Sequence, residues 1–218
     1  MTLTHIAHKV RNVTRGAIQR YGLSSMKRHL WDREFASGRW KCLEDAPTDC
    51  LYPHVERYVA KGNILDLGCG PGATANALNP GAYTLYTGID ISAVAIDKAR
   101  KKSAENHRTA KAEYWQAEIY TYKPTRRYDV IVFGDSLCYI PENRITPMLL
   151  RYCDYLTPSG VIIVRLRGYP GVINIVESQL AVLEKHLYHN SEVCVIIGRQ
   201  KNESMTVDCS GMSIPKGS

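Results

Sequence analysis

The stretch Asn63–Ala73, which reads Asn-Ile-Leu-Asp-Leu-Gly-Cys-Gly-Pro-Gly-Ala, is the most informative part of this 218-residue chain for predicting its fold. A short apolar run carrying Asp66 leads into Gly68, Gly70 and Gly72, and residues typical of a helix start follow. Glycine has no Cβ and tolerates positive φ, so a turn of this kind lets a ligand approach the backbone after a parallel strand. The stretch therefore predicts a ligand site at the carboxyl end of the first strand.

This turn fits more than one kind of nucleotide cofactor, and NAD is one of them. Gly68, Gly70 and Ala73 also satisfy the Gly-x-Gly-x-x-Gly/Ala pattern of NAD-binding proteins. The carboxylate of Asp66 would repel a nearby pyrophosphate, but it suits a ligand with an ammonium group, or a network that fixes the turn. The acid therefore points away from NAD. A tight turn that only packs a helix onto a strand is the structural alternative.

The stretch resembles the Asp-x-Gly-x-Gly-x-Gly motif of class I S-adenosylmethionine-dependent methyltransferases, and every position of that motif is filled. The resemblance implies an α/β fold, Rossmann-like, with a seven-stranded mostly parallel sheet, helices on both faces and an antiparallel C-terminal hairpin. It implies S-adenosylmethionine as the cofactor, with the first part of its site at Asp66, Gly68, Cys69, Gly70 and Gly72.

Two further acids extend the expected cofactor site. The run Leu85–Ile91 reads as the second strand, and Asp90 lies about twenty residues past the glycines, where a carboxylate can accept both ribose hydroxyls. The third strand leads to Glu118. In the family an acid at this place accepts a hydrogen bond from the adenine amino group, although aspartate is more usual there. The resemblance also places Ile91 and Ile119 beside the cofactor.

The N-terminal 45 residues contain nine Lys/Arg and four Asp/Glu, so this basic segment supplies +5 of the chain's net charge of +7. A helix is expected over Ile6–Leu23, interrupted at Gly16. Such a segment could meet RNA, an anionic sugar, a phosphorylated substrate or a membrane surface, or it could be a solvated helix face. No RNA-binding motif accompanies the charges, so a nucleic-acid partner is not expected.

An aromatic-rich run follows over Leu30–Trp40. Its spacing resembles the entry segment of small-molecule and polysaccharide-cluster methyltransferases, where the segment lies across the cofactor pocket. The resemblance places Trp40 at the cofactor. Large aromatics that only attach an extra helix to the sheet are the alternative.

The fourth strand is predicted over Tyr128–Asp135, a nearly continuous apolar run of the kind found in buried parallel strands. The segment Asp135–Ile140 resembles the one that follows this strand in nodulation-type N-methyltransferases and in polysaccharide-cluster enzymes. We expect Asp135 beside the sulfonium, either steadying the methionine moiety or acting as a base that Tyr139 can assist. A buried acid capping the turn is the alternative. The segment is not Asn/Asp-Pro-Pro-Tyr, which disfavours methylation of nucleic-acid bases.

Arginines end the fifth strand, which is predicted over Val161–Arg167. Ligands of open α/β sheets bind outside the carboxyl ends of the strands, so Arg165 and Arg167 are expected to bind an anionic substrate. The competing interpretation is structural, with the pair forming salt bridges to Glu177 or Glu184.

The other predicted elements connect these strands. The helices are expected at Pro53–Ala60, Ala73–Leu78, Ala93–Asn106 with Ser92 as cap, Thr146–Leu156 and Val172–His186, and the terminal hairpin at Glu192–Ile197 and Met205–Cys209.

The chain is expected to divide into a basic helical cap at residues 1–45, a methyltransferase domain at 46–210 and a tail at 211–218. Its seven cysteines form no Cys-x-x-Cys pair, so neither a disulfide framework nor a metal site is expected. No run of signal-peptide or membrane-spanning length occurs, so we expect a cytoplasmic protein without a membrane span.

The function that these features favour is methyl transfer from S-adenosylmethionine to an oxygen or nitrogen of a small molecule or saccharide, including an anionic one. An NAD-type oxidoreductase and a non-catalytic cofactor-binding protein are the alternatives. The first would need a catalytic group such as a Tyr-x-x-x-Lys pair, and the sequence contains none.

Overall fold

The computed structural model describes residues 3–44 and 48–201, with side chains from residue 12 onward apart from that of residue 43. The described residues form one seven-stranded sheet in the order β3-β2-β1-β4-β5-β7-β6. Neighbouring strands from β3 to β5 are parallel, whereas β7 is antiparallel to both β5 and β6. This confirms the predicted sheet. Its strands are β1 (Asn63–Leu67), β2 (Leu85–Asp90), β3 (Ala112–Gln116), β4 (Tyr128–Gly134), β5 (Leu156–Arg167), β6 (Leu180–Tyr188) and β7 (Val193–Gln200).

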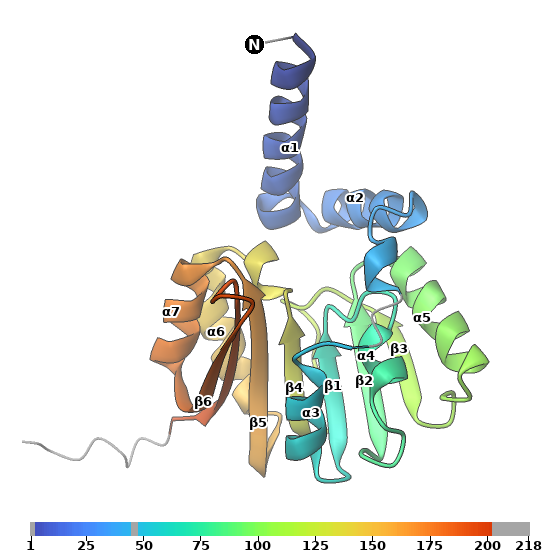
Figure 1. Ribbon diagram of the computed structural model, residues 1–218, viewed down its shortest axis with the longest axis vertical. Helices are drawn as coiled ribbons and strands as arrows, with labels where there is room; N and C mark the ends of the chain where they lie inside the picture. Colours follow the sequence, from blue (N-terminus) through green and yellow to red (C-terminus); the bar gives the residue numbers. More distant parts are fainter. Residues whose placement is uncertain (1–2, 45–47, 202–218) are drawn as a thin grey trace, which may run out of the picture.

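Helices cover both faces of the sheet (Figure 1), because the parallel strands are apolar on both sides. Successive residues of a strand point to opposite faces: Leu65 belongs to one core cluster and Ile64 to the other. The first cluster is completed by α6 (Glu142–Cys153) and α7 (Pro170–Gln179), and the second by α3 (Tyr52–Val59), α4 (Ala73–Ala77) and α5 (Ala93–Glu105).

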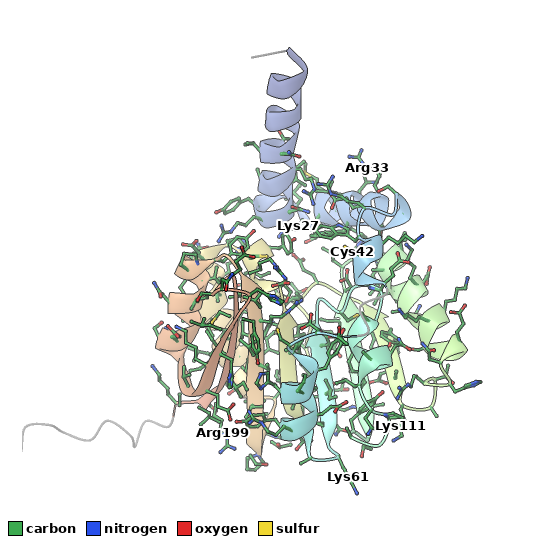
Figure 2. All side chains as sticks on the ribbon, viewed as in Figure 1. Lys27, Arg33, Cys42, Lys61, Lys111 and Arg199 are labelled. Atoms are coloured by element: carbon green, nitrogen blue, oxygen red, sulfur yellow. The ribbon has the colours of Figure 1, made fainter. Side chains whose placement is uncertain are left out.

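Two N-terminal helices lie beyond the carboxyl ends of the parallel strands. The helix α2 (Ser24–Ala36) lies across this end of the sheet, and α1 (Leu3–Tyr21) extends away from it (Figure 1). The helix α1 continues through Gly16, so the predicted interruption there is wrong. Figure 2 shows Lys27 where these helices meet the domain, while Lys61 and Lys111 lie at the opposite end. Short 3₁₀ turns occur at η1 (Lys41–Leu43) and η2 (Leu137–Tyr139).

Two predicted helix boundaries are wrong. The helix α6 begins at Glu142 rather than Thr146, and Pro147 lies inside it, although a proline more often marks a helix start. The helix α7 ends at Gln179, and the residues predicted to continue it form β6, which pairs with β7. Strand pairing here outweighs the helical spacing of the apolar residues.

The terminal hairpin is therefore composed differently from the prediction. The strand expected at Glu192–Ile197 is present as β7, but β6 precedes it as its partner. The other predicted strand, Met205–Cys209, lies outside the described residues. Within the described ranges, no helix combines the length and apolarity that crossing a membrane requires.

Candidate active site

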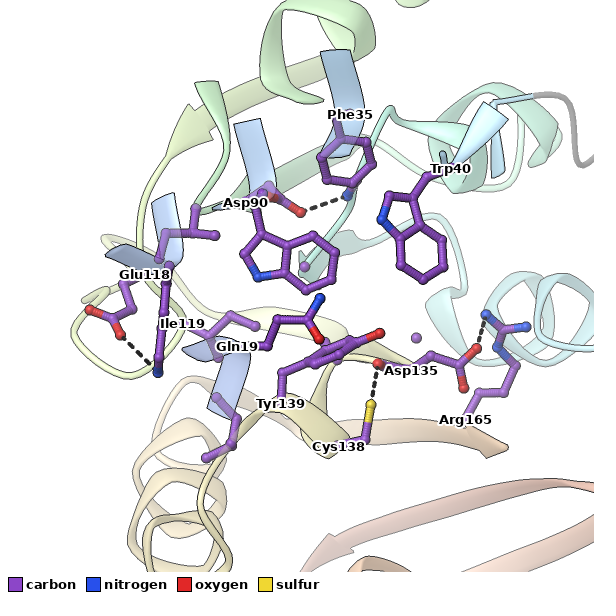
Figure 3. A pocket seen from close by; sticks show the side chains of 18 of the residues that line it. Gln19, Phe35, Trp40, Asp90, Glu118, Ile119, Asp135, Cys138, Tyr139 and Arg165 are labelled. Carbon is purple, nitrogen blue, oxygen red and sulfur yellow. Dashed lines mark hydrogen bonds and ion pairs between the residues drawn. The ribbon is translucent and has the colours of Figure 1, made fainter. Parts of the chain in front are cut away.

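A cavity of about 490 Å³ lies between the carboxyl ends of the strands and the two N-terminal helices (Figure 3). Its floor comes from the turns after β1, β2 and β4 and from the end of β5, and its roof comes from α1, α2 and the segment after α2. The lining residues are Gln19, Lys27, Trp31, Phe35, Trp40, Asp49, Gly68, Gly70, Asp90, Ile91, Glu118, Ile119, Gly134, Asp135, Ser136, Cys138, Tyr139, Ile140, Arg165, Arg167 and Tyr169.

The glycine-rich turn needs its glycines for backbone geometry and for space. Gly68 has φ +89°, and a Cβ there would lie 2.7 Å from the Cβ of Ser136. Gly72 has φ +79°, caps α4, and would place a Cβ 2.9 Å from that of Ala99. Side chains at either position would therefore clash with neighbouring elements as well as strain the backbone. Gly68 and Gly70 line the cavity, whereas Gly72 lies behind it.

Asp66 and Cys69 do not line the cavity but lie under the turn. The hydroxyl of Tyr86 donates to Asp66 Oδ2 at 2.6 Å. Burial raises the pKa of Asp66 to about 6, although hydrogen bonds from Tyr86 and Thr74 oppose that shift. Of the two roles considered for Asp66, its contacts match the network that fixes the turn. Burial also raises the pKa of the Cys69 thiol, which makes it an inert packing group.

Asp90 lines the cavity at the end of β2, next to Ile91. Its two carboxylate oxygens accept hydrogen bonds from the backbone N–H groups of Gly70 (3.0 Å) and Ser92 (2.9 Å). Each carboxylate oxygen has two lone pairs, so acceptor capacity remains for a ligand. Burial is the main cause that raises the pKa of Asp90 to about 6. The carboxylate is thus oriented by the turn and reachable from the cavity.

Glu118 and Ile119 line the same cavity, but the Glu118 carboxylate already has partners on α2. The hydroxyl of Ser24 donates to it at 2.6 Å, and Lys27 lies 3.8 Å away. Burial lowers the pKa of Lys27, while the charge of Glu118 raises it. Glu118 therefore connects the segment after the third strand to α2, in addition to facing the cavity.

Aromatic rings form the roof. Trp31 lies with its ring centroid 4.9 Å from that of Tyr139, edge to face, and 5.9 Å from those of Phe35 and Trp40. Trp40 Nε1 donates to Glu34 at 2.9 Å. Burial raises the pKa of Tyr139, so its hydroxyl remains protonated at neutral pH and can donate a hydrogen bond.

Asp135 lies at the end of β4 in the left-handed region, with φ +55°. Its Oδ2 is 2.9 Å from the Arg165 guanidinium, whose other terminal nitrogen donates to Asp49 at 2.7 Å. Burial raises the pKa of Asp135, and the charge of Arg165 opposes that shift. Its other oxygen, Oδ1, has no hydrogen-bond partner among the described residues. This acid therefore presents one free acceptor at the cavity floor.

Arg167 is the less constrained of the two arginines, since its side chain is 56% exposed and lies 3.9 Å from Glu192. Neither arginine pairs with Glu177 or Glu184, so the predicted alternative partners are wrong: Glu177 pairs with Lys185, and Glu184 with Arg57 and His186. Both arginines also line a second cavity of about 360 Å³, together with Thr48, Asp49, Cys50, His189 and Val193.

Several lining residues were not predicted from the sequence. Trp31 and Phe35 belong to the aromatic-rich run that the sequence singled out, so their spacing was a usable signal. Gln19 and Asp49 gave none, because their positions depend on how the segments before β1 fold over the sheet.

A second cluster of ligand-type side chains lies away from this cavity, between α3 and β6. Potential ligand atoms of His54, Glu184 and His186 lie within 4.8 Å of one another. Both oxygens of Glu184 are already engaged, by Tyr58 on one side and by Arg57 and His186 on the other. The cluster thus resembles a satisfied hydrogen-bond network more than an open metal site.

Comparison with known proteins finds methyltransferases. Residues 64–160 match the model of a family described as a methyltransferase domain. The ubiquinone biosynthesis O-methyltransferase of Rickettsia canadensis is 25% identical over 137 residues, which cover 62% of this chain and 56% of that protein. The trans-aconitate 2-methyltransferase of Escherichia coli is 32% identical over 107 residues, which cover 47% of this chain and 38% of that protein. The chain thus spans about half or less of these curated relatives.

Solved structures share the fold. The N-methyltransferase NodS of Bradyrhizobium japonicum, solved with S-adenosylhomocysteine, superposes with a TM-score of 0.64 at 19% identity, covering 80% of this chain and 98% of that one.

Proposed function

We propose that this chain, which carries a class I methyltransferase domain over residues 64–160, transfers the methyl group of S-adenosylmethionine to an oxygen or nitrogen of a small molecule or saccharide. The domain match and the shared fold confirm the resemblance that the glycine-rich turn predicts. The activity rests on one observation: the glycine-rich turn, Asp90 and Asp135 all open onto the same cavity.

The cavity has features that suit this cofactor. Gly68 and Gly70 present backbone without Cβ atoms, and Asp90 presents an oriented carboxylate, which fits a ribose diol. Trp40 belongs to the aromatic roof and can pack against a ligand below it. Cys69, Gly72 and Asp66 support the turn from behind. S-adenosylmethionine supplies, when bound, a methyl group on a cationic sulfur.

The chain's own residues then position the acceptor. Methyl transfer from a sulfonium is an in-line displacement, for which orientation supplies much of the rate enhancement. Asp135 Oδ1 can accept the proton of an acceptor O–H or N–H, or it can hold the ammonium group of the methionine moiety. Tyr139, which remains protonated, can donate a hydrogen bond to an oxygen of the acceptor.

An anionic acceptor is supported by Arg165 and Arg167 at the cavity wall. The name of the trans-aconitate relatives points to acidic substrates among similar proteins, and the names of the O-methyltransferase relative and of NodS leave both oxygen and nitrogen open as the methylated atom.

We also propose that the chain divides into a cap at residues 1–45, a domain at 46–210 and a tail at 211–218. The six described cysteines are free thiols, which supports the cytoplasm as the compartment.

Calorimetry tests the cofactor and mass spectrometry tests the chemistry. We expect binding of S-adenosylmethionine and S-adenosylhomocysteine, no binding of NAD, and a mass gain of one methyl group on at least one member of a panel of hydroxy and amino compounds. Binding of NAD alone would favour the oxidoreductase. Binding of S-adenosylhomocysteine without turnover on any acceptor would favour the non-catalytic protein.

A further inference from the structure

Gln19 is a buried amide in the roof of the cavity. It lies on α1, is 4% exposed, and its Nε2 has no hydrogen-bond partner among the described residues. Figure 3 shows the Gln19 side chain among those that line the cavity, together with Tyr139 and Asp135. A buried amide N–H without a partner is unfavourable, and such groups are rare in folded proteins. A ligand atom that accepts a hydrogen bond from Gln19 Nε2 would remove this unfavourable free energy.

The same cavity collects most of the other unpartnered groups. Six buried side-chain atoms lack a hydrogen-bond partner among the described residues, and four of them belong to residues that line this cavity. The four are Gln19 Nε2, Arg165 Nε, Asp135 Oδ1 and Ser136 Oγ. Two of these are donors, one is an acceptor, and the serine hydroxyl can be either.

The position of Gln19 is held by its neighbours on the helix. Arg15, one turn before it, pairs with the buried Glu34 of α2. Arg20, directly after it, donates to the Ile140 carbonyl at 3.2 Å and to Glu142 at 3.1 Å. These contacts attach the end of α1 to α2 and to the residues of the cavity floor, so the Gln19 amide faces the cavity rather than solvent.

We propose that Gln19 Nε2 and Arg165 Nε bind the carboxylate of the methyl acceptor, while the acceptor's O–H or N–H group faces Asp135 Oδ1. The acceptor is thus a hydroxy or amino carboxylic acid, and Gln19 is a specificity-determining residue on the N-terminal cap. This inference rests on the proposed function. Both terminal nitrogens of Arg165 are already paired, with Asp49 and Asp135, so Nε is its remaining donor and Gln19 Nε2 supplies the second one.

The methionine carboxylate of the cofactor is the competing ligand for the same donors. The two assignments differ in what a Gln19 substitution changes. If Gln19 holds the acceptor, affinity for S-adenosylhomocysteine is preserved and affinity for the acid falls. If it holds the cofactor, affinity for S-adenosylhomocysteine itself falls.

The test compares the wild type with Gln19→Met, which keeps the side chain's length without its donor. Ala17→Met, on the exposed side of the same helix, is the matched control. Each protein is titrated with S-adenosylhomocysteine, and the loaded protein is then titrated with lactate, salicylate and D-glucuronate against lactamide, salicylamide and D-glucose. We expect at least one acid to bind the wild type and the control at least tenfold more tightly than its neutral counterpart. In Gln19→Met we expect that acid to weaken by about 10- to 100-fold, as for a lost hydrogen bond to a charged group.

Thermal melting gives a second readout that needs no acceptor. Because Gln19→Met removes an unpartnered buried amide, its melting temperature should equal or exceed that of the wild type. Gln19→Glu, which places a like charge opposite the acid, should abolish binding of the acid while S-adenosylhomocysteine still binds.

Three results would overturn the inference. One is a weakened affinity of Gln19→Met for S-adenosylhomocysteine, the second is unchanged acid binding in both Gln19 variants, and the third is no preference of the wild type for any acid. Failure of the wild type to bind S-adenosylhomocysteine would instead count against the proposed function.

Discussion

Asp90 is the residue whose role in cofactor binding is most directly testable. Asp90→Asn keeps an oxygen that can accept from Gly70 or Ser92 but removes the charge that strengthens hydrogen bonds to a ribose. We expect the dissociation constant for S-adenosylhomocysteine, measured by calorimetry, to rise by about 10- to 100-fold. Glu105→Gln on α5, a change to an exposed acid outside the cavity, is the control and should bind normally. Wild-type affinity in Asp90→Asn would refute the ribose role.

Asp66 makes stability depend on pH in the direction opposite to a paired surface acid. Its pKa of about 6 in the folded chain exceeds its ordinary value of 3.8, so the folded state holds more protons between these values. The free energy of unfolding therefore falls as pH rises from about 4 to about 6, by about 2 to 3 kcal/mol for this group. In Asp66→Asn the side-chain oxygen can still accept from Tyr86, but the free energy of unfolding no longer falls with pH through this group. The melting temperature of this variant relative to wild type should be higher at pH 7.5 than at pH 4.5. An equal difference at both pH values would contradict the shift, and Asp97→Asn is the exposed control.

Arg167 tests the charge preference of the acceptor. Its guanidinium lines both cavities, and its nearest acid, Glu192, is exposed, so its charge is available to a ligand. We expect Arg167→Gln to raise KM for an anionic acceptor by about tenfold, with little change for a neutral one, as expected for a lost charge-assisted hydrogen bond. Arg199→Gln at the opposite end of the sheet is the matched control (Figure 2). Equal effects on both kinds of acceptor would assign Arg167 to the fold.

At the scale of elements, the Asp32 carboxylate links α2 to the start of α5, and Lys98 of α5 adds a second contact by donating to the Phe35 carbonyl of α2 at 2.9 Å. Asp32 Oδ1 accepts from the Ser92 hydroxyl at 2.6 Å and from the Val94 backbone at 3.3 Å. Ser92 also caps α5 by accepting from Ala95, so Asp32→Ala removes the link but leaves the cap. We expect the free energy of unfolding to fall by about 1 to 2 kcal/mol and amide exchange in α2 to accelerate. Asp97→Ala, in the first turns of the same helix, should change neither. Unaltered exchange in α2 would show that other contacts hold it.

Element boundaries show where sequence patterns are sufficient and where they are not. The strands β1, β2 and β4 could be predicted to within a residue or two, because each is a buried apolar run bounded by a turn. The segment after Gln179 could not, since it is rich in helix-forming residues and a shift in register between Val182 and Glu184 breaks its two-residue alternation. Only its pairing with β7, a contact with a later part of the chain, makes it a strand.

At the scale of the whole molecule, the parts of the site that the sequence revealed are those that the sheet topology brings together. Gly68, Asp90 and Asp135 lie at the carboxyl ends of three different strands, and these ends of parallel strands meet at one edge. Gln19 and Asp49 carry no comparable signal, because the path of the N-terminal segment over that edge is set by side-chain pairs such as Arg15 with Glu34.

Because the sheet edge and the N-terminal segment are held by different contacts, we can predict which properties remain after removal of α1. A chain that begins at Leu23 loses the contacts of Arg15 and Arg20 but keeps those of Ser24, Lys27 and Asp32 with the domain. We expect it to unfold in one cooperative transition at a lower melting temperature and to bind S-adenosylhomocysteine within about tenfold of the full chain. Calorimetry of both chains measures this. Loss of the cooperative transition would show that α1 is an integral part of the core.

The roof of the cavity also has a kinetic consequence. Trp31, Phe35 and Trp40 cover a floor made by the sheet, and Ser24 and Asp32 fasten that cover to the same turns that face the ligand. We expect a spent cofactor beneath this roof to leave more slowly while these contacts are in place. We therefore expect product departure, rather than bond making at the methyl group, to limit the steady-state rate, so that the first turnover runs faster than all later ones.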